Sequence, residues 1–469
     1  MGSKFETRLL GELCHEITVG FVGTMTNEYI ENGIPFLRSK NIEEYDVKWD
    51  DMKYVSSAFH KKLSKSVLKP GDVAIVRTGK PGTTCVIPND LREANCSDIV
   101  IARVNNELLC PHYLSYFMNA MAHGQVNAHI VGAVQQHFNV SSAKKLEIPL
   151  PSRVKQTKIV QVLKTLDDKL KLNRQINQTL EQMAQTLFKS WFVDFDPVVD
   201  NALDAGFFEQ DLAFSDELLR RVEVRKAVRE SDNFKPLSED IRRLFPNAFE
   251  ECAEPALGLG GWMPKGWMSK SISDAIFINP KVNLAKDTVA KFVDMKALPT
   301  SGYSIEEVSE KPFSGGMKFQ NNDILLARIT PCLENGKTGI VDFLSENEAG
   351  FGSTEFIILR GNKNIHYSYI ACLARYESFR QHVIQSMVGS SGRQRVQNGC
   401  FNDYKIAVPS GEVMNRFADI VSPSFKKLTQ NTNESRSLTK LRDTLLPKLI
   451  SGELSLSDIK IDIPEETLI

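Results

Sequence analysis

A short stretch near the end of the chain carries side chains that suit the reading of nucleic-acid bases. The sequence GSSGRQRVQ (389–397) places Arg393, Gln394 and Arg395 directly after four small, flexible residues. An arginine can donate two hydrogen bonds to the edge of guanine, and a glutamine can pair in a similar way with adenine. The stretch is therefore a candidate base-reading loop, and a solvated basic loop without a ligand is the alternative.

A second candidate loop lies in the first half of the chain. The sequence GAVQQHFN (132–139) corresponds to the stretch around Arg393 and offers Gln135, Gln136 and His137. Amides and an imidazole carry fewer donors than a guanidinium, so we expect weaker contacts from this loop. Together the two loops predict one reading site in each half of the chain.

Two arginines stand at matching places, each at the end of an apolar stretch typical of a strand. Arg77 ends VAIVR and Arg328 lies in DILLARI, and the loops that follow contain Lys80 and Lys337. Loops at strand ends are where a rigid scaffold presents contacts to a ligand. We expect these four cations to contact DNA, and a buried ion pair is the alternative for the arginines.

The charge distribution leaves cations free for phosphate contacts although the net charge is only −1. Residues 194–254 hold 16 acidic and 8 basic side chains, so the rest of the chain carries a net charge of +7. Arg38 and Lys40 in PFLRSKNI are candidate phosphate contacts, with an ordinary surface role as the alternative. The small net charge therefore does not exclude a nucleic-acid partner.

Composition and cysteine usage describe an ordinary intracellular protein of two or more domains. Of the 469 residues, 42% are hydrophobic and 25% charged, and the apolar runs are too short to span a bilayer. The N-terminal MGSKFETRLL lacks the apolar core of a signal peptide. Eight cysteines are scattered without a CxxC pair, which favours free thiols in a reducing cytoplasm and no metal site.

The sequence contains an internal repeat. The segment IPLPSR (148–153) is echoed by IAVPSG (406–411), an offset of 258 residues. Upstream, residues 69–82 resemble 320–339, and residues 131–152 resemble 388–410. Internal repetition of this kind indicates two copies of one structural unit. The predicted order is globular unit, long helix, linker, globular unit, long helix.

The globular units have the pattern of mixed α/β (α+β) domains. β-branched runs bounded by Gly, Asn and Pro predict strands at VAIVR (73–77), DIVIARV (98–104), DILLARI (323–329) and EFIILR (355–360). Short helices are predicted at 111–121 and 365–376.

The two long segments follow a heptad seam over 159–187 and 417–445, interrupted by polar residues at matching places. Pro447 is predicted to end the second helix. If the helices pair, Asn173 and Asn177 face Asn431 and Ser435, and this polar layer would fix their register. Solvent-facing asparagines are the alternative.

The direction of pairing follows from a functional argument, because a parallel pair would align the same polar residues. An antiparallel pair would carry one globular unit at each end of a rod. About 29 residues at 1.5 Å rise give about 43 Å. One turn of DNA is about 34–36 Å, so the rod would set the distance between two DNA half-sites.

The chain resembles the specificity (S) subunit of a type I restriction–modification system over nearly its whole length. The motifs that carry the resemblance are LDDKLKLNRQINQTLEQMAQTLFKSWFVDFDP (166–197), VGAVQQHFNV (131–140), DILLARITPCLENGK (323–337), MPKGW (263–267) and LLPKLISGEL (445–454). The resemblance implies a noncatalytic subunit whose two target-recognition domains each read half of a split, asymmetric site in double-stranded DNA.

The same resemblance implies partners and cofactors. Helical regions of such subunits set the spacer and dock two methyltransferase (M) subunits, which would methylate adenine N6 with S-adenosylmethionine. Restriction (R) subunits would add ATP- and Mg-dependent translocation and cleavage. The apolar patch of Trp191, Phe192 and Phe195 is a candidate docking surface for a methyltransferase, with packing against a globular unit as the alternative.

Catalytic motifs are missing from the sequence. An adenine methyltransferase needs an Asn/Asp-Pro-Pro-aromatic loop, and the nearest strings, FINPK (277–281) and FDPVV (195–199), do not match it. LENGKTG (333–339) lacks the first glycine of a phosphate-binding loop. We therefore expect no catalytic residue, no metal and no cofactor in this chain, and no membrane contact.

These observations predict a DNA-binding specificity subunit in the cytoplasm of a bacterium or archaeon. A free-standing restriction or modification enzyme and a two-domain adaptor that does not bind DNA are the alternatives. The expected parts are a first recognition domain (1–152), a spacer helix (153–193), an acidic linker (194–254), a second recognition domain (255–410), a second spacer helix (411–452) and a tail (453–469).

Overall fold

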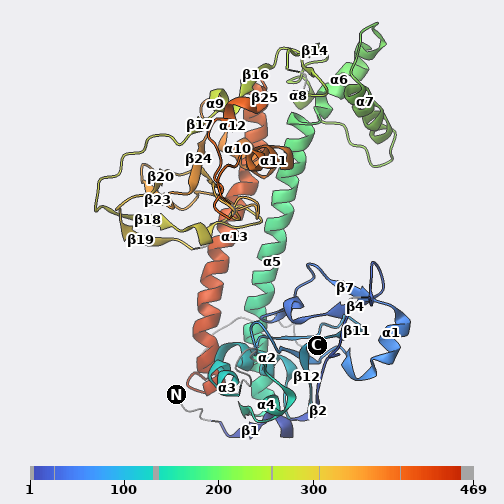
Figure 1. Ribbon diagram of the computed structural model, residues 1–469, viewed down its shortest axis with the longest axis vertical. Helices are drawn as coiled ribbons and strands as arrows, with labels where there is room; N and C mark the ends of the chain where they lie inside the picture. The colour runs from blue at the N-terminus through green and yellow to red at the C-terminus, as the bar shows by residue number, and fades with distance from the viewer. Residues whose placement is uncertain are drawn as a thin grey trace. The chain divides into compact units, whose positions relative to one another are not determined.

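The chain divides into two compact units that share two long helices. The computed structural model describes residues 5–25, 27–129, 137–254, 257–305, 307–390 and 392–455. The first unit comprises residues 1–171 and 437–469, and the second comprises residues 172–436. The long helices are α5 (Arg153–Phe192) and α13 (Gly411–Ser451), and each contributes one part to either unit (Figure 1).

The first unit contains two main sheets. A four-stranded antiparallel sheet has the order β10-β9-β12-β2, and a five-stranded sheet has the order β3-β7-β4-β11-β8, in which β4 and β11 are parallel. Runs of buried, mostly β-branched residues form the central strands, as the sequence predicts. The strands are β2 (Cys14–Val19), β3 (Tyr29–Ile30), β4 (Ile34–Leu37), β7 (Lys53–Val55), β8 (Val67–Leu68), β9 (Val73–Val76), β10 (Thr84–Val86), β11 (Ala94–Cys96) and β12 (Ile99–Val104).

Smaller elements complete the first unit. Strand β1 (Thr7–Leu9) pairs with β13 (Glu147–Pro149), and the hairpin of β5 (Ile42–Glu43) and β6 (Asp46–Val47) follows β4. The predicted helix at 111–121 is confirmed as α2. The helices are α1 (Ser57–Lys62), α2 (Pro111–Met121), α3 (His123–Ala128) and α4 (Val140–Lys144).

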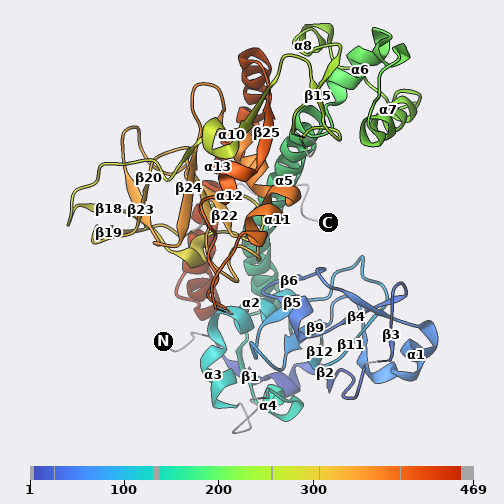
Figure 2. The same cartoon turned by 45° about the horizontal axis from the view of Figure 1, so that its top comes forward.

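The second unit repeats most of these pairings, but its mixed sheet has four strands, and the described residues contain no counterpart of β3. Its antiparallel sheet has the order β22-β21-β24-β17, and its mixed sheet has the order β19-β18-β23-β20, with β18 and β23 parallel (Figure 2). Strand β16 pairs with β25 as β1 pairs with β13. The strands are β16 (Met268–Ser271), β17 (Phe277–Ile278), β18 (Val289–Val293), β19 (Ser309–Pro312), β20 (Met317–Phe319), β21 (Ile324–Ala327), β22 (Thr338–Ile340), β23 (Gly350–Gly352), β24 (Phe356–Arg360) and β25 (Lys405–Val408). The sequence repeat is therefore a repeat of topology.

The helices of the second unit follow the order of the first only in part, because no helix of the described residues corresponds to α1. The predicted helix at 365–376 is confirmed as α10 (Tyr367–Arg375). It is preceded by α9 (Ile272–Ala275) and followed by α11 (Glu377–Gln385) and α12 (Cys400–Asp403). Mixed α/β units, each followed by a long helix, are thus the observed architecture.

The two long helices pair antiparallel, as expected from the sequence. In the first unit, Ile159 and Leu163 near the start of α5 share a buried cluster with Leu449 and Ile450 near the end of α13. In the second unit, the end of α5 instead shares a cluster with Phe417 and other residues near the start of α13. In each unit, the start of one long helix therefore packs beside the end of the other.

Pro447 does not end the second helix, so that prediction is wrong. Helix α13 continues to Ser451 although proline lacks the N–H for one helical hydrogen bond. Leu446, Leu449 and Ile450 are almost fully buried, and Pro447 itself is exposed. Burial of the three apolar side chains outweighs the lost hydrogen bond, since each contributes about 1.5–3 kcal/mol.

The acidic segment 194–254 is folded as part of the second unit. It contains α6 (Asp196–Asp204), α7 (Asp216–Arg229), α8 (Glu239–Arg242) and β14 (Phe249–Glu251), which pairs with β15 (Trp262–Pro264). Three aspartates of α6 meet three arginines of α7 four residues apart on each helix: Asp196–Arg221, Asp200–Arg225 and Asp204–Arg229. The ladder gives three of the sixteen acids of the segment a partner within it, and the net charge of the segment stays at −8.

Candidate nucleic-acid interface

In the first unit, three chain segments meet at the carboxylate of Asp98, between β11 and β12. The guanidinium of Arg77, just after β9, lies 3.6 Å from the Asp98 carboxylate, and the hydroxyl of Thr78 donates to the same group. Ser39, just after β4, donates to the Asp98 carbonyl at 2.7 Å. The predicted cation Arg77 therefore stands beside an acid, and the pair is partly exposed, unlike the buried ion pair of the alternative.

A second carboxylate gathers the predicted phosphate contacts. Asp51 accepts from Arg38 and Lys40, and its second oxygen lies 3.0 Å from the ammonium of Lys53. Hydrogen bonds from Lys40 and Lys53 hold the pKa of Asp51 well below its usual range. Three cations around one acid leave a local excess of positive charge, which suits a phosphate.

The turn before Asp51 presents an aromatic side chain. The buried amide of Asn41 donates to the carbonyls of Lys48 at 3.1 Å and Asp50 at 3.3 Å, which anchors the turn on both sides of Trp49. The Trp49 side chain is 48% exposed. Sequence reasoning missed this residue, because nothing local to it indicates that the turn is anchored.

The remaining candidates of the first unit are only partly described. Lys80 is exposed after β9, and His137 is half-buried with no hydrogen-bond partner for Nδ1 among the described residues. The amide of Phe138 donates to the Arg77 carbonyl at 3.1 Å, so the loop of His137 returns beside Arg77. Gln135 and Gln136 lie outside the described residues.

In the second unit, the predicted reading loop lies beside the end of β21. The amide of Val396 donates to the Arg328 carbonyl at 3.0 Å, as Phe138 does to Arg77. Arg395 forms an ion pair with Glu355, which stands between β23 and β24 as Asp98 does between β11 and β12. The hydrogen bonds from Arg395 lower the pKa of Glu355.

The other three candidates of this unit differ in how free they are. The side chain of Arg393 is exposed. Gln394 is fixed through its backbone, which exchanges hydrogen bonds with Thr330. The ammonium of Lys337 donates to the Met295 carbonyl at 2.8 Å, so this cation stabilises a neighbouring loop.

The acids are the part of the site that sequence reasoning missed. Asp98 and Glu355 each precede a predicted strand, in DIVIARV and EFIILR, and a matching carboxylate at both places was the available signal. The Lys40–Asp51 pair also has a counterpart, Lys296–Glu307, whose charged atoms lie 2.9 Å apart. Both units therefore build their candidate surfaces around carboxylates at equivalent strand ends.

The polar residues of the helix seam meet within the second unit. Asn431 donates to the side-chain oxygen of Asn177 at 2.8 Å. Asn173 donates to Glu434 at 2.9 Å and to the hydroxyl of Ser435 at 3.3 Å. The alternative that these asparagines face solvent does not hold for Asn173 and Asn431, because each is only 1% exposed.

The aromatic patch at the end of α5 is not a docking surface, which corrects that prediction. Trp191, Phe192 and Phe195 are all at least 94% buried. Trp191 packs edge-on against Phe245 with ring centroids 4.9 Å apart, and Phe192 packs in the same way against Phe417. The folded acidic segment and α13 cover the patch, so packing within the unit accounts for it.

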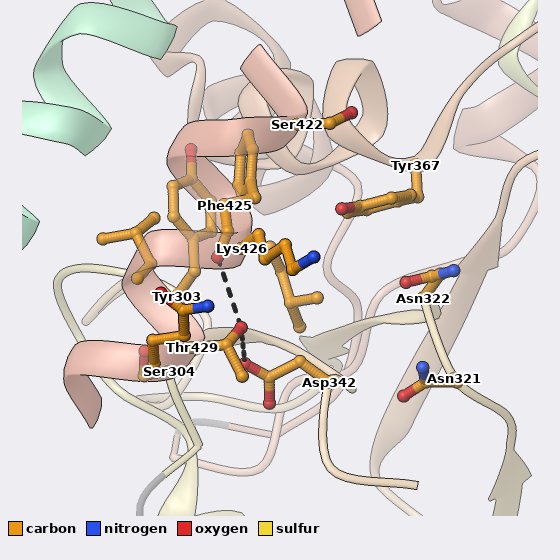
Figure 3. A pocket seen from close by; sticks show the side chains of 13 residues that line it. Tyr303, Ser304, Asn321, Asn322, Asp342, Tyr367, Ser422, Phe425, Lys426 and Thr429 are labelled. Atoms are coloured by element: carbon orange, nitrogen blue, oxygen red, sulfur yellow. Dashed lines mark hydrogen bonds between the residues drawn. The ribbon is translucent and has the colours of Figure 1, made fainter. Parts of the chain in front are cut away.

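The second unit also contains a pocket of about 440 Å³ beside α13. Figure 3 shows Asp342 facing Thr429, whose hydroxyl donates to the carboxylate at 2.6 Å. Burial raises the pKa of Asp342. The aromatic rings of Tyr303, Tyr367 and Phe425 line the walls. One carboxylate bonded to a hydroxyl lacks the paired groups of acid–base catalysis.

Within the described parts of the chain, no three His, Cys, Asp or Glu side chains are grouped as metal ligands would be. In the same residues no helix is long and apolar enough to cross a membrane.

Known proteins similar to this chain are specificity subunits of type I restriction enzymes. A family model described as the type I restriction modification DNA specificity domain matches residues 2–182. The type I restriction enzyme HindI specificity subunit of Haemophilus influenzae is 26% identical and aligns over 83% of this chain and 88% of its own length. The MjaIX specificity subunit of Methanocaldococcus jannaschii is 24% identical over 93% of this chain and 90% of its own length.

A solved structure has the same fold. The S subunit of a type I restriction–modification system from M. genitalium aligns over 95% of this chain and 96% of its own, with a TM-score of 0.53 and 14% identity. The family model matches the first part of the chain, and the solved structure shows that the duplicated fold is shared. Over most of its length the chain is similar to type I restriction enzyme specificity subunits, the noncatalytic DNA-recognition components of such systems.

Proposed function

We propose that the chain reads a bipartite, asymmetric site in double-stranded DNA, one half with each unit. The observation that carries this proposal is the repeated construction at Arg77 and Arg328. Each arginine follows a buried central strand, and each accepts a backbone hydrogen bond from the predicted reading loop. Two equivalent scaffolds that carry different side chains would read two different half-sites.

The proposal assigns residues 1–152 and 255–410 as recognition domains and residues 153–193 and 411–452 as spacer helices. The direct DNA contacts would come from exposed cations, with Lys80 and Arg393 the least engaged within the protein. Arg38, Lys40, Arg77, Arg328 and Arg395 would contact DNA from positions fixed by neighbouring groups. Gln135, Gln136, His137, Gln394 and Lys337 complete the proposed surface.

The chain would act only within a larger complex in the cytoplasm. Two methyltransferase subunits would bring S-adenosylmethionine to adenine N6, and restriction subunits would bring ATP and Mg. Because Trp191, Phe192 and Phe195 are buried, the methyltransferases would dock on exposed faces of the helices instead.

The helix pair would set the spacing of the half-sites, and the polar layer of Asn173, Asn177, Asn431 and Ser435 would fix its register. The experiment inserts seven residues into each helix, after Lys171 and after Arg436, so that the heptad seam is kept. The insertion adds about 10.5 Å of helix, which corresponds to about three base pairs. We expect the preferred spacer to lengthen by that amount while both half-sites keep their sequence.

The readout is a map of methylated adenines in cells that carry the chain with its partner subunits. An unchanged spacer would refute the role of the helices. Binding of the complex to a DNA duplex should also weaken steeply as salt is added, because counterions are released when cations meet phosphates. An adaptor that does not bind DNA would show no such dependence.

A further inference from the structure

The ion pair of Arg395 engages only one side of its guanidinium. Nε donates to both carboxylate oxygens of Glu355 at 3.0 Å, and Nη2 donates to one of them at 2.7 Å. Among the described residues, Nη1 has no hydrogen-bond partner. The outward N–H groups of Nη1 and Nη2, which form the end of the guanidinium fork, therefore remain able to donate to a ligand. The Arg395 side chain is 46% exposed.

Both partners of this pair are held by the protein on their backbone side. The Glu355 carbonyl accepts from Arg328 at 2.9 Å, and the Glu355 amide donates to Ser353 at 3.2 Å. The backbone of Arg395 exchanges two hydrogen bonds with Val388, at 3.0 and 3.1 Å. The Glu355 side chain is only 23% exposed, so the acid is the more enclosed partner. The guanidinium is consequently aimed before any ligand arrives, which reduces the entropy lost on binding.

The free end of the fork matches one base. Guanine presents two acceptors, O6 and N7, in the major groove, and the two outward N–H groups of an arginine can bond both. Adenine presents N7 beside an amino group, so one of the two donors would meet another donor. Cytosine offers a donor at the corresponding place, and thymine offers one acceptor and a methyl group.

We propose that Glu355 is a positioning residue that aims Arg395 at a guanine in the half-site read by the second unit. This inference rests on the proposed function and names one base of the target. Glu355 does not touch the DNA. It acts through Arg395, by occupying the side of the guanidinium that would otherwise turn toward a phosphate.

The first unit supplies a contrast. Asp98 occupies the place equivalent to Glu355, yet its nearest contact with Arg77 is 3.6 Å, and Thr78 donates to the same carboxylate. Arg77 is also less exposed, at 22%. The half-site of the first unit is therefore not expected to depend on an arginine aimed in this way. Asp98→Asn is the matched control variant.

The experiment uses the complete complex of this chain with its methyltransferase partners, after mapping of methylated adenines has given the target site. Binding is measured on duplexes in which each guanine of the second half-site is replaced in turn by adenine or by 7-deazaguanine, which lacks N7. For the wild type, one such position should lose about 5- to 150-fold in affinity, the range for a bidentate base contact.

Glu355→Gln keeps the size of the side chain and removes its charge. We expect this variant to lose most of the discrimination at that one position, while preferences in the first half-site and the salt dependence of binding stay as in the wild type. Arg395→Lys should abolish the same preference, because an ammonium lacks the fork. Asp98→Asn should leave it intact.

Two results would overturn the inference. The first is a Glu355→Gln complex that keeps the full preference for guanine, and the second is a wild-type complex that tolerates 7-deazaguanine at every position of the second half-site. Either could occur while the complex still binds its bipartite site specifically, in which case the proposed function would stand. A wild-type complex that binds all duplexes equally would instead reject the proposed function.

Thermal unfolding of each variant distinguishes a folding defect from a guanidinium that is no longer held in position. The 7-deazaguanine measurement on the wild type needs no variant, so the inference is testable even if Glu355→Gln fails to fold.

Discussion

The double substitution Asn173→Leu and Asn431→Leu should stabilise the protein while it impairs the spacing of the DNA half-sites. Both asparagines are 1% exposed, and the Oδ1 atom of each has no hydrogen-bond partner among the described residues. A buried polar atom without a partner costs about 1–3 kcal/mol, so the two oxygens together cost about 2–6 kcal/mol.

The hydrogen bonds that the two amides donate stabilise the protein by less than this cost. Asn431 donates to Asn177 at 2.8 Å, and Asn173 donates to Glu434 at 2.9 Å and to Ser435 at 3.3 Å, and three such bonds contribute about 1.5–4.5 kcal/mol. Asn177 is half-buried and Glu434 is exposed, so water can replace the lost donors after substitution. The net expectation is a gain of about 0.5–1.5 kcal/mol in the free energy of unfolding.

The loss would appear in function. An apolar residue at these positions fits its neighbours equally well after a shift of the helices, whereas the amide pairs fit one register. We expect methylation to spread over sites with more than one spacer length while both half-sites keep their sequence.

Two assays test this prediction. Urea unfolding measures the stability. The comparison is valid if the slope of the unfolding free energy against urea concentration is the same for the variant and the wild type. Mapping of methylated adenines measures the spacer. The control is Gln175→Leu on the exposed face of α5, which should change the stability by no more than about 0.5 kcal/mol. A destabilised double variant would refute the energetic reasoning, and a single unchanged spacer would refute the register role.

Three further predictions follow from the same contacts. Burial raises the pKa of Glu181 to about 6 from 4.5. Between these pH values the folded state keeps a proton that the unfolded state has lost, so the stability falls as the pH rises from about 4.5 to 6. Glu181→Gln should remove this slope and raise the stability at pH 7 by about 2 kcal/mol, and an unchanged urea midpoint at pH 7 would contradict it. Trp191→Ala should lower the stability by about 3–5 kcal/mol, whereas Lys189→Ala, at an exposed position of the same helix two residues earlier, should change it little in the same unfolding assay. Arg393→Ala should weaken DNA binding. An equal loss of affinity on unrelated sequences, with a shallower salt dependence, would identify a phosphate contact. A loss confined to one half-site would identify a base contact.

Much of the fold follows from local pattern and from repetition. The runs beginning at Val73 and Ile324 predict central strands because they are short, continuous and apolar, and both are buried strands. The heptad seam predicts which side chains of the two long helices turn inward, and its members are buried or half-buried in the structure. These features depend on residues close together in the sequence.

Several features could not be predicted in this way. The burial of Trp191 depends on Phe245 and Phe417, which lie more than fifty and two hundred residues away along the chain. The pairing of three aspartates of α6 with three arginines of α7 requires the two helices to lie together. Pairings between such distant residues leave no periodicity, so the sequence indicated neither the burial of the aromatic patch nor these ion pairs.

The sequence by itself determined that the protein has two copies of one α/β unit, two long seamed helices and candidate cations at equivalent strand ends. Repetition and period survive in any arrangement of the elements. The tertiary structure decided which of those cations are free. It placed Glu355 against one side of Arg395, drew Asp51 among three cations and bound Lys337 to a carbonyl. The freedom of a charge depends on the groups that folding brings beside it, and these come from distant parts of the chain.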